Sequence, residues 1–285
     1  MQSVLASTAA PAACPACGEP ALSRLHPLVT NHPSVGRLRS DVMQCARCDH
    51  RFLVTTEVEQ RTVEAKYDHA YAGFVPDPYF ARVIREVIAG ELVPRKAPPA
   101  RVLDVGCGGG EFMQAASEAG YTVEGVDVSA AAAERCRARG FNARAGDFLT
   151  LDFEGGYDMI TLWDVAEHLR DPHGFMVRAR TLLAPGGILV LKIPGFGRLS
   201  FTATGAVNRL AGSVLGAPGH VQYFTPQSLQ ALLTRAGYAS VEWLPPRQFR
   251  QRPRTSSLKR LMGRGINKVI RAVAGNRNLF VIAHP

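Results

Sequence analysis

The stretch Val102–Phe112, with the sequence VLDVGCGGGEF, decides the fold of this 285-residue chain. A short apolar run leads into four glycines, at positions 106 and 108–110, and a helix-like pattern follows. Glycines permit a tight turn and close approach of a ligand to the backbone, and the amides that open a helix favour a carboxylate or a phosphate. The stretch therefore predicts a strand–turn–helix unit that holds a ligand, although dinucleotide enzymes and purely structural turns share the glycine pattern.

Strand and helix patterns alternate from Arg101 to the end of the chain. Apolar runs predict seven strands, at 101–105, 122–126, 142–145, 157–162, 188–193, 241–244 and 279–283. Helical patterns occupy 111–119, 129–139, 171–183 and 225–236, and Pro185–Gly187 is predicted to close the third of them. Because strands separated by helices form right-handed crossovers, we predict an α/β fold with a Rossmann-like, seven-stranded, doubly wound parallel sheet.

Four regions follow one another along the chain. We predict a disordered tail at 1–13, a zinc-binding ribbon at 14–56, a helical linker or cofactor lid at 57–99, and a Rossmann-like domain at 100–285. The last region contains two segments, 195–219 and 245–278, that are longer than the ordinary connections of about 2–6 residues. We expect these two insertions to contact the substrate.

The composition, 46% hydrophobic and 20% charged, is that of a globular protein. No apolar run reaches the ~18 residues of a membrane span, and no signal-peptide pattern opens the chain, so a cytoplasmic protein is expected. The net charge of +9 is concentrated in residues 244–285, which contain ten Lys or Arg and no Asp or Glu. Within them, 257–274 has a basic amphipathic pattern. It is interpreted as a helix packed on the domain, with peripheral membrane contact as the alternative.

Acidic residues lie within or directly after three predicted strands. Asp104 lies two residues before Gly106, Asp127 follows the second strand, and Asp147 precedes Phe148 after the third. An acid at the position of Asp127 can accept hydrogen bonds from both hydroxyls of a ribose. An acid followed by an aromatic residue suits an adenine amino group and ring.

Together these features resemble the class I S-adenosylmethionine-dependent methyltransferases, whose first motif is similar to VLDVGCGGGEF. The segments ITLWDVAEHL (160–169), LLAPGG (182–187) and HVQYFTP (220–226) are similar to the branch that includes ubiquinone-biosynthesis O-methyltransferases. The resemblance covers the chain from residue 101 to about residue 244. It implies S-adenosylmethionine as the cofactor, bound by Asp104, Gly106, Cys107, Gly108, Gly110, Asp127, Val128, Asp147, Phe148, Trp163 and Asp164.

Two histidines are the predicted catalytic residues. Methyl transfer from a sulfonium requires alignment of the reactants and exclusion of water, and a hydroxyl nucleophile also needs a base. His168 and His220 are expected beyond the carboxyl ends of strands, where ligands bind in such sheets. A structural brace and a packing role are the respective alternatives. Tyr223 is predicted to contact the substrate, and Glu167-His168 also resembles a divalent-metal pair of some ubiquinone-pathway relatives.

Two CxxC units, Cys14/Cys17 and Cys45/Cys48, are separated by 27 residues. Their four thiolates are enough for a closed tetrahedral site, which leaves no position open for chemistry, so we predict structural Zn²⁺. Binding of the metal would supply the folding energy of so small a module. Redox chemistry at one CxxC unit would not explain the second.

These features favour a small-molecule methyltransferase, with O-methylation of a sugar, polyol or natural-product intermediate. An RNA methyltransferase that uses the ribbon and the basic C-terminal segment is the second interpretation, and the scarcity of aromatic residues for base stacking makes nucleic acid the less favoured partner. A non-catalytic cofactor-binding protein is the third, against which Asp127 argues. The acceptor atom and the oligomeric state stay open.

Overall fold

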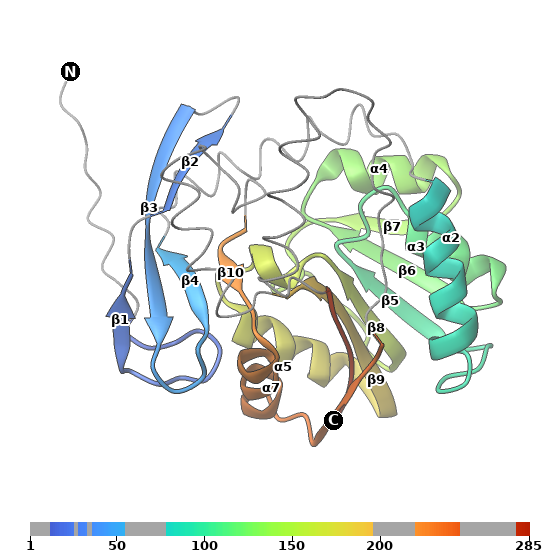
Figure 1. The fold of residues 1–285 in the computed structure, drawn as a ribbon. Helices are drawn as coiled ribbons and strands as arrows, with labels where there is room; N and C mark the ends of the chain where they lie inside the picture. Colours follow the sequence, from blue (N-terminus) through green and yellow to red (C-terminus); the bar gives the residue numbers. More distant parts are fainter. Residues whose placement is uncertain (1–11, 26–27, 33–35, 55–77, 196–219, 246–277) are drawn as a thin grey trace, which may run out of the picture.

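The computed structural model describes residues 12–25, 28–32, 36–54, 78–195, 220–245 and 278–285 (Figure 1). Its centre is a seven-stranded sheet in the order β11-β12-β9-β8-β5-β6-β7. The strands are β5 (Arg101–Val105), β6 (Thr122–Asp127), β7 (Asn142–Ala145), β8 (Tyr157–Trp163), β9 (Leu183–Pro194), β11 (Ser240–Trp243) and β12 (Asn278–His284). The predicted Rossmann-like α/β fold is confirmed.

One strand departs from the predicted parallel sheet. β12 runs antiparallel to β9, with Val281 opposite Leu191, and β11 runs antiparallel to β12. The pairs β5–β6, β5–β8, β6–β7 and β8–β9 are parallel, as predicted. Parallel neighbours need a crossover, whereas antiparallel neighbours do not. The alternation of strand and helix patterns does not show whether β12 follows β11 by a crossover, so it does not predict the direction of β12.

Helices cover both faces of this sheet. Their bounds are α2 (Pro78–Val87), the π-helix η1 (Ile88–Leu92), α3 (Glu111–Glu118), α4 (Ala130–Ala138), the 3₁₀ turn η2 (Ala166–His168), α5 (Pro172–Leu182) and α7 (Pro226–Arg235). Alternate strand residues face opposite sides, so Leu103 packs on the side of α5 and α7 and Val102 on the side of α2 and α3. Burial on both faces is the reason why the central strands are apolar throughout.

Capping residues set the helix starts, and one predicted helix stop is wrong. Ser129, Asp171 and Thr225 each accept a backbone hydrogen bond as the N-cap of α4, α5 and α7. Pro185–Gly187 does not close α5, because that helix ends at Leu182 and β9 begins at the next residue. The register between β8 and β9 shifts there, so these residues form an irregularity inside a strand, which is a common place for Pro and Gly in sheets.

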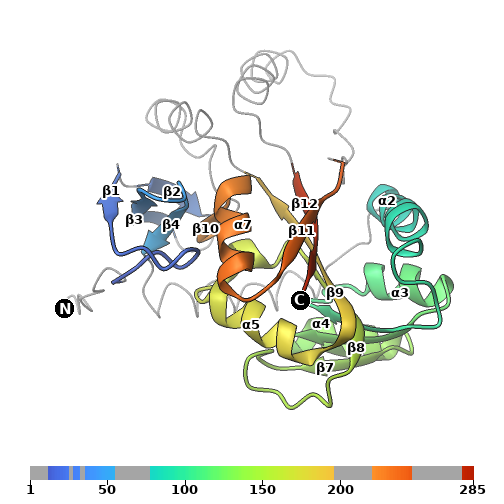
Figure 2. The same ribbon diagram turned by 90° about the horizontal axis from the view of Figure 1, so that it is seen from below.

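A second sheet is formed by the N-terminal module together with one distant strand. The module contributes β1 (Leu22–Arg24), β2 (Leu28–His32), β3 (Gly36–Cys45) and β4 (Arg51–Val54), and β10 (Gln222–Tyr223) completes the sheet. β10 pairs antiparallel with β4, with Gln222 opposite Phe52. In both ribbon views β10 lies between β4 and α7 (Figures 1 and 2). The module is therefore joined to the large domain through backbone pairing.

Several predicted segments lie outside the described residues. They are residues 1–11 of the tail, residues 55–77 before α2, and residues 196–219 and 246–277 of the two insertions, which include the basic segment 257–274. Among the helices that the structure describes, none is long and apolar enough to cross a bilayer.

Candidate functional site

The predicted glycine turn lies between β5 and α3 and is tied to the neighbouring strand. The amides of Gly106 and Cys107 both donate to the carbonyl of Val126 on β6, at 2.7 and 3.1 Å. Gly106 has a positive φ of 75°, and a Cβ atom at this position would lie 2.4 Å from Cγ2 of Val165. Only glycine fits there, because the turn closely approaches the loop that follows β8.

Asp127 closes the opposite side of the turn. Its carboxylate accepts a hydrogen bond from the amide of Gly108 and another from the amide of Ser129, both at 2.9 Å. The side chain is 7% exposed at the end of β6. The predicted ribose-binding acid and the predicted amide donors are thus brought together at the carboxyl ends of adjacent parallel strands, where ligands bind in this class of sheet.

Asp104 lies buried beneath this turn. Its carboxyl accepts a hydrogen bond of 2.8 Å from the hydroxyl of Thr161 on β8. Burial, with smaller contributions from Asp127 and Glu111, raises the pKa of Asp104 to about 7. A cation placed near Asp104 would therefore shift its carboxyl towards the ionised form.

The remaining predicted cofactor residues fall into two groups. Val128 is 59% exposed, Asp147 is exposed, and Asp164 is partly exposed, so these side chains have surface to offer a ligand. Phe148 and Trp163 lie in the two cores instead, with exposed fractions of 3% and 9%. Cofactor contact through these two rings stays a prediction, and their burial is accounted for by packing.

The two predicted catalytic histidines meet around a buried glutamate. The rings of His168 and His220 are 4.7 Å apart and almost perpendicular. Their Nε2 atoms lie 4.0 and 3.9 Å from Oε1 of Glu167, which is 1% exposed. The ligand atoms of all three residues lie within 4.8 Å of one another, a spacing compatible with a divalent cation or with exchange of a proton. His168 and Glu167 belong to η2, directly after Val165, so the cluster adjoins the glycine turn.

Lys192 is a member of this region that the sequence interpretation missed. It lies on β9, 5% exposed, and its ammonium donates to both carboxylate oxygens of Asp164. Asp164 takes a positive φ of 55° directly after β8. Desolvation, and next the charge of Asp164, raise the pKa of Glu167 well above its ordinary value. A lysine within the apolar run ILVLKI was the signal that could have revealed this charged cluster.

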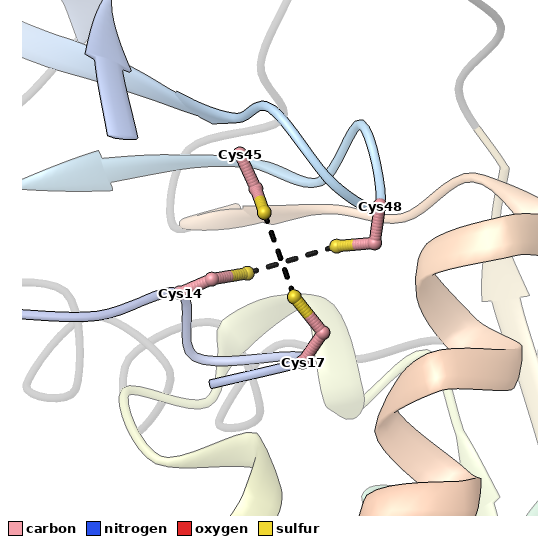
Figure 3. A group of neighbouring side chains, drawn as sticks. All are labelled: Cys14, Cys17, Cys45 and Cys48. Atoms are coloured by element: carbon pink, nitrogen blue, oxygen red, sulfur yellow. Dashed lines mark hydrogen bonds between the residues drawn. The ribbon is translucent and has the colours of Figure 1, made fainter. Parts of the chain in front are cut away.

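The four cysteines of the N-terminal module converge on one point (Figure 3). The Sγ atoms of Cys14 and Cys48 are 3.7 Å apart, and those of Cys17 and Cys45 are 3.5 Å apart. Four sulfurs at ~2.3 Å from a tetrahedral metal lie about 3.8 Å from one another. The cluster therefore has dimensions that fit a zinc ion.

Both cysteine pairs have the same turn geometry. The amide of Gly18 donates to the carbonyl of Cys14, and the amide of Asp49 donates to the carbonyl of Cys45. Gly18 and Asp49 each follow the second cysteine of a pair, and each has a positive φ. This matched pair of turns is what brings the two units face to face.

Tyr223 does not face an open surface. Its side chain is fully buried and packs against Val42 of the N-terminal module. Substrate contact by Tyr223 stays a prediction, and packing of β10 on the module explains its position. The neighbouring Gln222 and the buried His50, which sequence reasoning did not select, connect the same two parts of the protein through side chains.

Comparison with known proteins matches this architecture. The sequence model of a family described as "Methyltransferase domain" matches residues 75–242, more than half of the chain. The ubiquinone biosynthesis O-methyltransferase of a Caulobacter species is 30% identical over 143 residues, which are 47% of this chain and 57% of that protein. The enzyme of the same name from Bordetella avium is 29% identical over 160 residues, 53% of this chain and 64% of that protein. The chain thus spans less than two thirds of the length of these curated relatives.

Solved structures agree at the level of the fold. A SAM-dependent methyltransferase from Archaeoglobus fulgidus has a TM-score of 0.51 at 20% identity and covers 72% of this chain, with 94% of its own length matched. A 1,6-didemethyltoxoflavin-N1-methyltransferase from Burkholderia thailandensis has a TM-score of 0.52 at 17% identity, covering 91% of this chain and 98% of its own. The family model, which matches more than half of the chain, shows that the chain belongs to the methyltransferase domain family. This confirms the predicted resemblance to the class I S-adenosylmethionine-dependent methyltransferases.

Proposed function

We propose that this protein transfers a methyl group from S-adenosylmethionine to a hydroxyl group of a small molecule. One observation carries the proposal: the turn of Gly106 packs against Val165, and the Glu167, His168 and His220 cluster begins two residues later. A cofactor-binding turn and a cluster with proton-accepting groups thus adjoin at one end of the sheet. This proximity is what an in-line displacement requires.

Each side of the candidate site has a separate task in this proposal. The amides that open α3 receive the carboxylate of the cofactor. Asp127, whose two carboxylate oxygens offer about four acceptor sites, binds the ribose alongside its two amide contacts. Asp104 supplies negative charge beneath the turn. The bound cofactor supplies an electrophilic methyl group, and the protein aligns it with the acceptor and keeps water away.

The acceptor side removes a proton. His168 and His220 are 23% and 14% exposed at their side chains, so an acceptor can reach them. Oε1 of Glu167 lies 4.0 and 3.9 Å from the Nε2 atoms of His168 and His220, and a carboxylate there stabilises whichever ring becomes protonated. Oxygen as the acceptor atom is supported by the names of the curated relatives, which are O-methyltransferases. A sugar, polyol or natural-product intermediate is the class of acceptor that we propose.

Zn²⁺ has a structural role in this proposal. The four thiolates of Cys14, Cys17, Cys45 and Cys48 would fill all positions of a tetrahedral ion. Two basic side chains of the module have acidic partners, since Arg24 pairs with Asp41 and Arg51 pairs with Asp49.

Calorimetric titration with S-adenosylmethionine tests the cofactor side. We expect the wild-type protein to bind S-adenosylmethionine and Asp127→Ala to lose at least tenfold in affinity, because two ribose hydrogen bonds are lost. A hydrogen bond is worth about 0.5–1.5 kcal/mol, and more when one partner is charged, as Asp127 is. Asp152 is an exposed acid that is not among the predicted site residues. Asp152→Ala therefore serves as the matched control and should bind the cofactor normally. Absence of binding by the wild-type protein would remove the proposal.

Turnover tests the acceptor side. A panel of sugars, polyols and natural products that carry a hydroxyl group is incubated with the cofactor, and release of S-adenosylhomocysteine is measured. His168→Gln and His220→Gln should keep the cofactor affinity, and loss of the base should reduce turnover by about 10²–10⁴-fold at one of the two positions. Wild-type rates in both variants would show that neither histidine is the base.

A further inference from the structure

A continuous hydrogen-bonded path joins the N-terminal module to the loop of Glu167 and His168. His50, fully buried, follows Cys48 by two residues. Its Nε2 atom lies 2.8 Å from Oε1 of Gln222, and Nε2 of Gln222 donates to the carbonyl of Leu169 at 2.8 Å. Since the amide nitrogen of Gln222 is used by Leu169, its oxygen accepts, and His50 is the donor at Nε2.

The backbone makes a second path beside the first. The amide of Leu53 on β4 donates to the carbonyl of Val221 at 2.9 Å. The amide of Val221 donates in turn to the carbonyl of Glu167 at 2.8 Å. Val221 is thus held between the module and η2, and it lies next to His220 in the chain.

Packing fixes the position of His50 itself. Its ring lies 4.6 Å from that of Phe224 and 5.8 Å from that of Phe52. The cysteines Cys14, Cys45 and Cys48 belong to the same hydrophobic core as Phe224 and the α7 side of the sheet. A displacement of the cysteine turns would therefore reach His50, and through it the loop at Leu169.

From these contacts we propose that His50 and Gln222 are positioning residues for the acceptor side. They hold the Glu167–His168 loop and His220 in their positions. The N-terminal module therefore sets the geometry of the cluster of Glu167, His168 and His220. The inference rests on the proposed function for its catalytic meaning. The hydrogen-bonded path and its effect on the loop are measurable without any substrate.

Hydrogen–deuterium exchange of the full-length, zinc-loaded protein tests the path. In Gln222→Met the amides of Val221 and of residues 166–169 should exchange at least tenfold faster than in the wild type, since their hydrogen bonds open more often. Gln227→Met is the matched control, because Gln227 donates to the carbonyl of Arg47 at 3.0 Å but does not reach Leu169. Cofactor affinity and zinc content should stay at wild-type values in both variants. Unchanged exchange at 166–169 in Gln222→Met would overturn the proposal.

A second pair of variants decides the question if Gln222→Met does not fold. His50→Gln keeps a donor for Oε1 of Gln222 and should retain wild-type exchange at residues 166–169, whereas His50→Leu should accelerate it. Equal exchange in the two His50 variants would overturn the role of this hydrogen bond. If wild-type protein fails to bind S-adenosylmethionine, the proposed function fails, but the exchange result still decides whether the module positions the loop.

Discussion

The two sides of the candidate site are assembled from the chain in different ways. The cofactor side comes from two consecutive strand–helix units, and its central hydrogen bond joins Gly108 to Asp127 across 19 positions. The acceptor side joins His50 to Gln222 across 172 positions and also requires the loop of His168. A site made of neighbouring units can be recognised as a motif and forms with the sheet. A site made of distant segments depends on how separate parts of the molecule dock.

Loss of the proposed zinc ion should produce the largest effect and should affect the two sides differently. Structural zinc contributes on the order of 10 kcal/mol to the folding of small metal-dependent modules. In Cys48→Ser, we therefore expect the module to unfold and exchange at residues 166–169 to rise, with cofactor affinity close to the wild-type value. Metal analysis, thermal unfolding and calorimetry measure the three quantities.

The control for the metal analysis is Cys136→Ala, a buried cysteine outside the module whose thiol donates to the carbonyl of Gly108. It should keep one zinc ion per chain. Loss of cofactor binding in Cys48→Ser would contradict the separate assembly of the two sides, because the hydrogen bonds from Gly108 and Ser129 to Asp127 lie within the large domain.

Substitution of Gly106 should have the second largest effect and should act on the opposite side. In Gly106→Ala the left-handed backbone costs about 1–2 kcal/mol, and the added Cβ would lie 2.4 Å from Val165. We expect a loss of stability of about 3 kcal/mol or more, together with weaker cofactor binding. Chemical denaturation and calorimetry provide the measurements.

Gly140→Ala is the matched control, since Gly140 also has a positive φ, 86°, but nothing lies within 4 Å of the added atom. Its loss of stability should come only from placing alanine in the left-handed backbone conformation. Combining Gly106→Ala with Val165→Ala should recover part of the loss. Equal losses of stability in Gly106→Ala and Gly140→Ala would show that the glycine turn does not pack tightly against Val165. That result would contradict the proposed contact between the two sides.

The smallest effect is expected from the ionisation of Asp104. The folded-state pKa is raised to about 7 from the ordinary 3.8, so the protonated form is favoured by folding. The stability associated with this group is therefore present at low pH and is lost as pH rises from about 4 to about 7, with a cost of a few kcal/mol at most. Asp104→Asn should remove this loss, which denaturation between pH 5 and pH 8 will measure.

The same group should link cofactor binding to pH. S-adenosylmethionine carries a sulfonium and an ammonium group, and positive charge favours the ionised form of Asp104. Affinity should fall as pH decreases below about 7 in the wild type and should change less in Asp104→Asn. Equal pH profiles for the two proteins would show that Asp104 does not sense the cofactor.

The sequence by itself determined the glycine turn, the acid beside it and the four-cysteine cluster, because these depend on short spacings. The glycine pattern after β5, the acid at the end of β6 and the two CxxC units are each local, and the strand–helix alternation dictated the sheet around them. Prediction failed where the direction or regularity of a strand depends on its partner in the sheet, at the antiparallel β12 and at the strand irregularity of Pro185–Gly187. The sequence also did not indicate that Tyr223 is buried against Val42.

Only the tertiary structure decided how the acceptor side is built. No spacing in the sequence connects Lys192 with Asp164, or His50 with Gln222, since each pair meets only after strands from separate units have paired. Nor does the sequence show that β10 leaves the large domain to join the sheet of the N-terminal module. The physical reason is that hydrophobic and glycine patterns encode local geometry, whereas the meeting of distant polar groups is fixed by the packing of the whole chain.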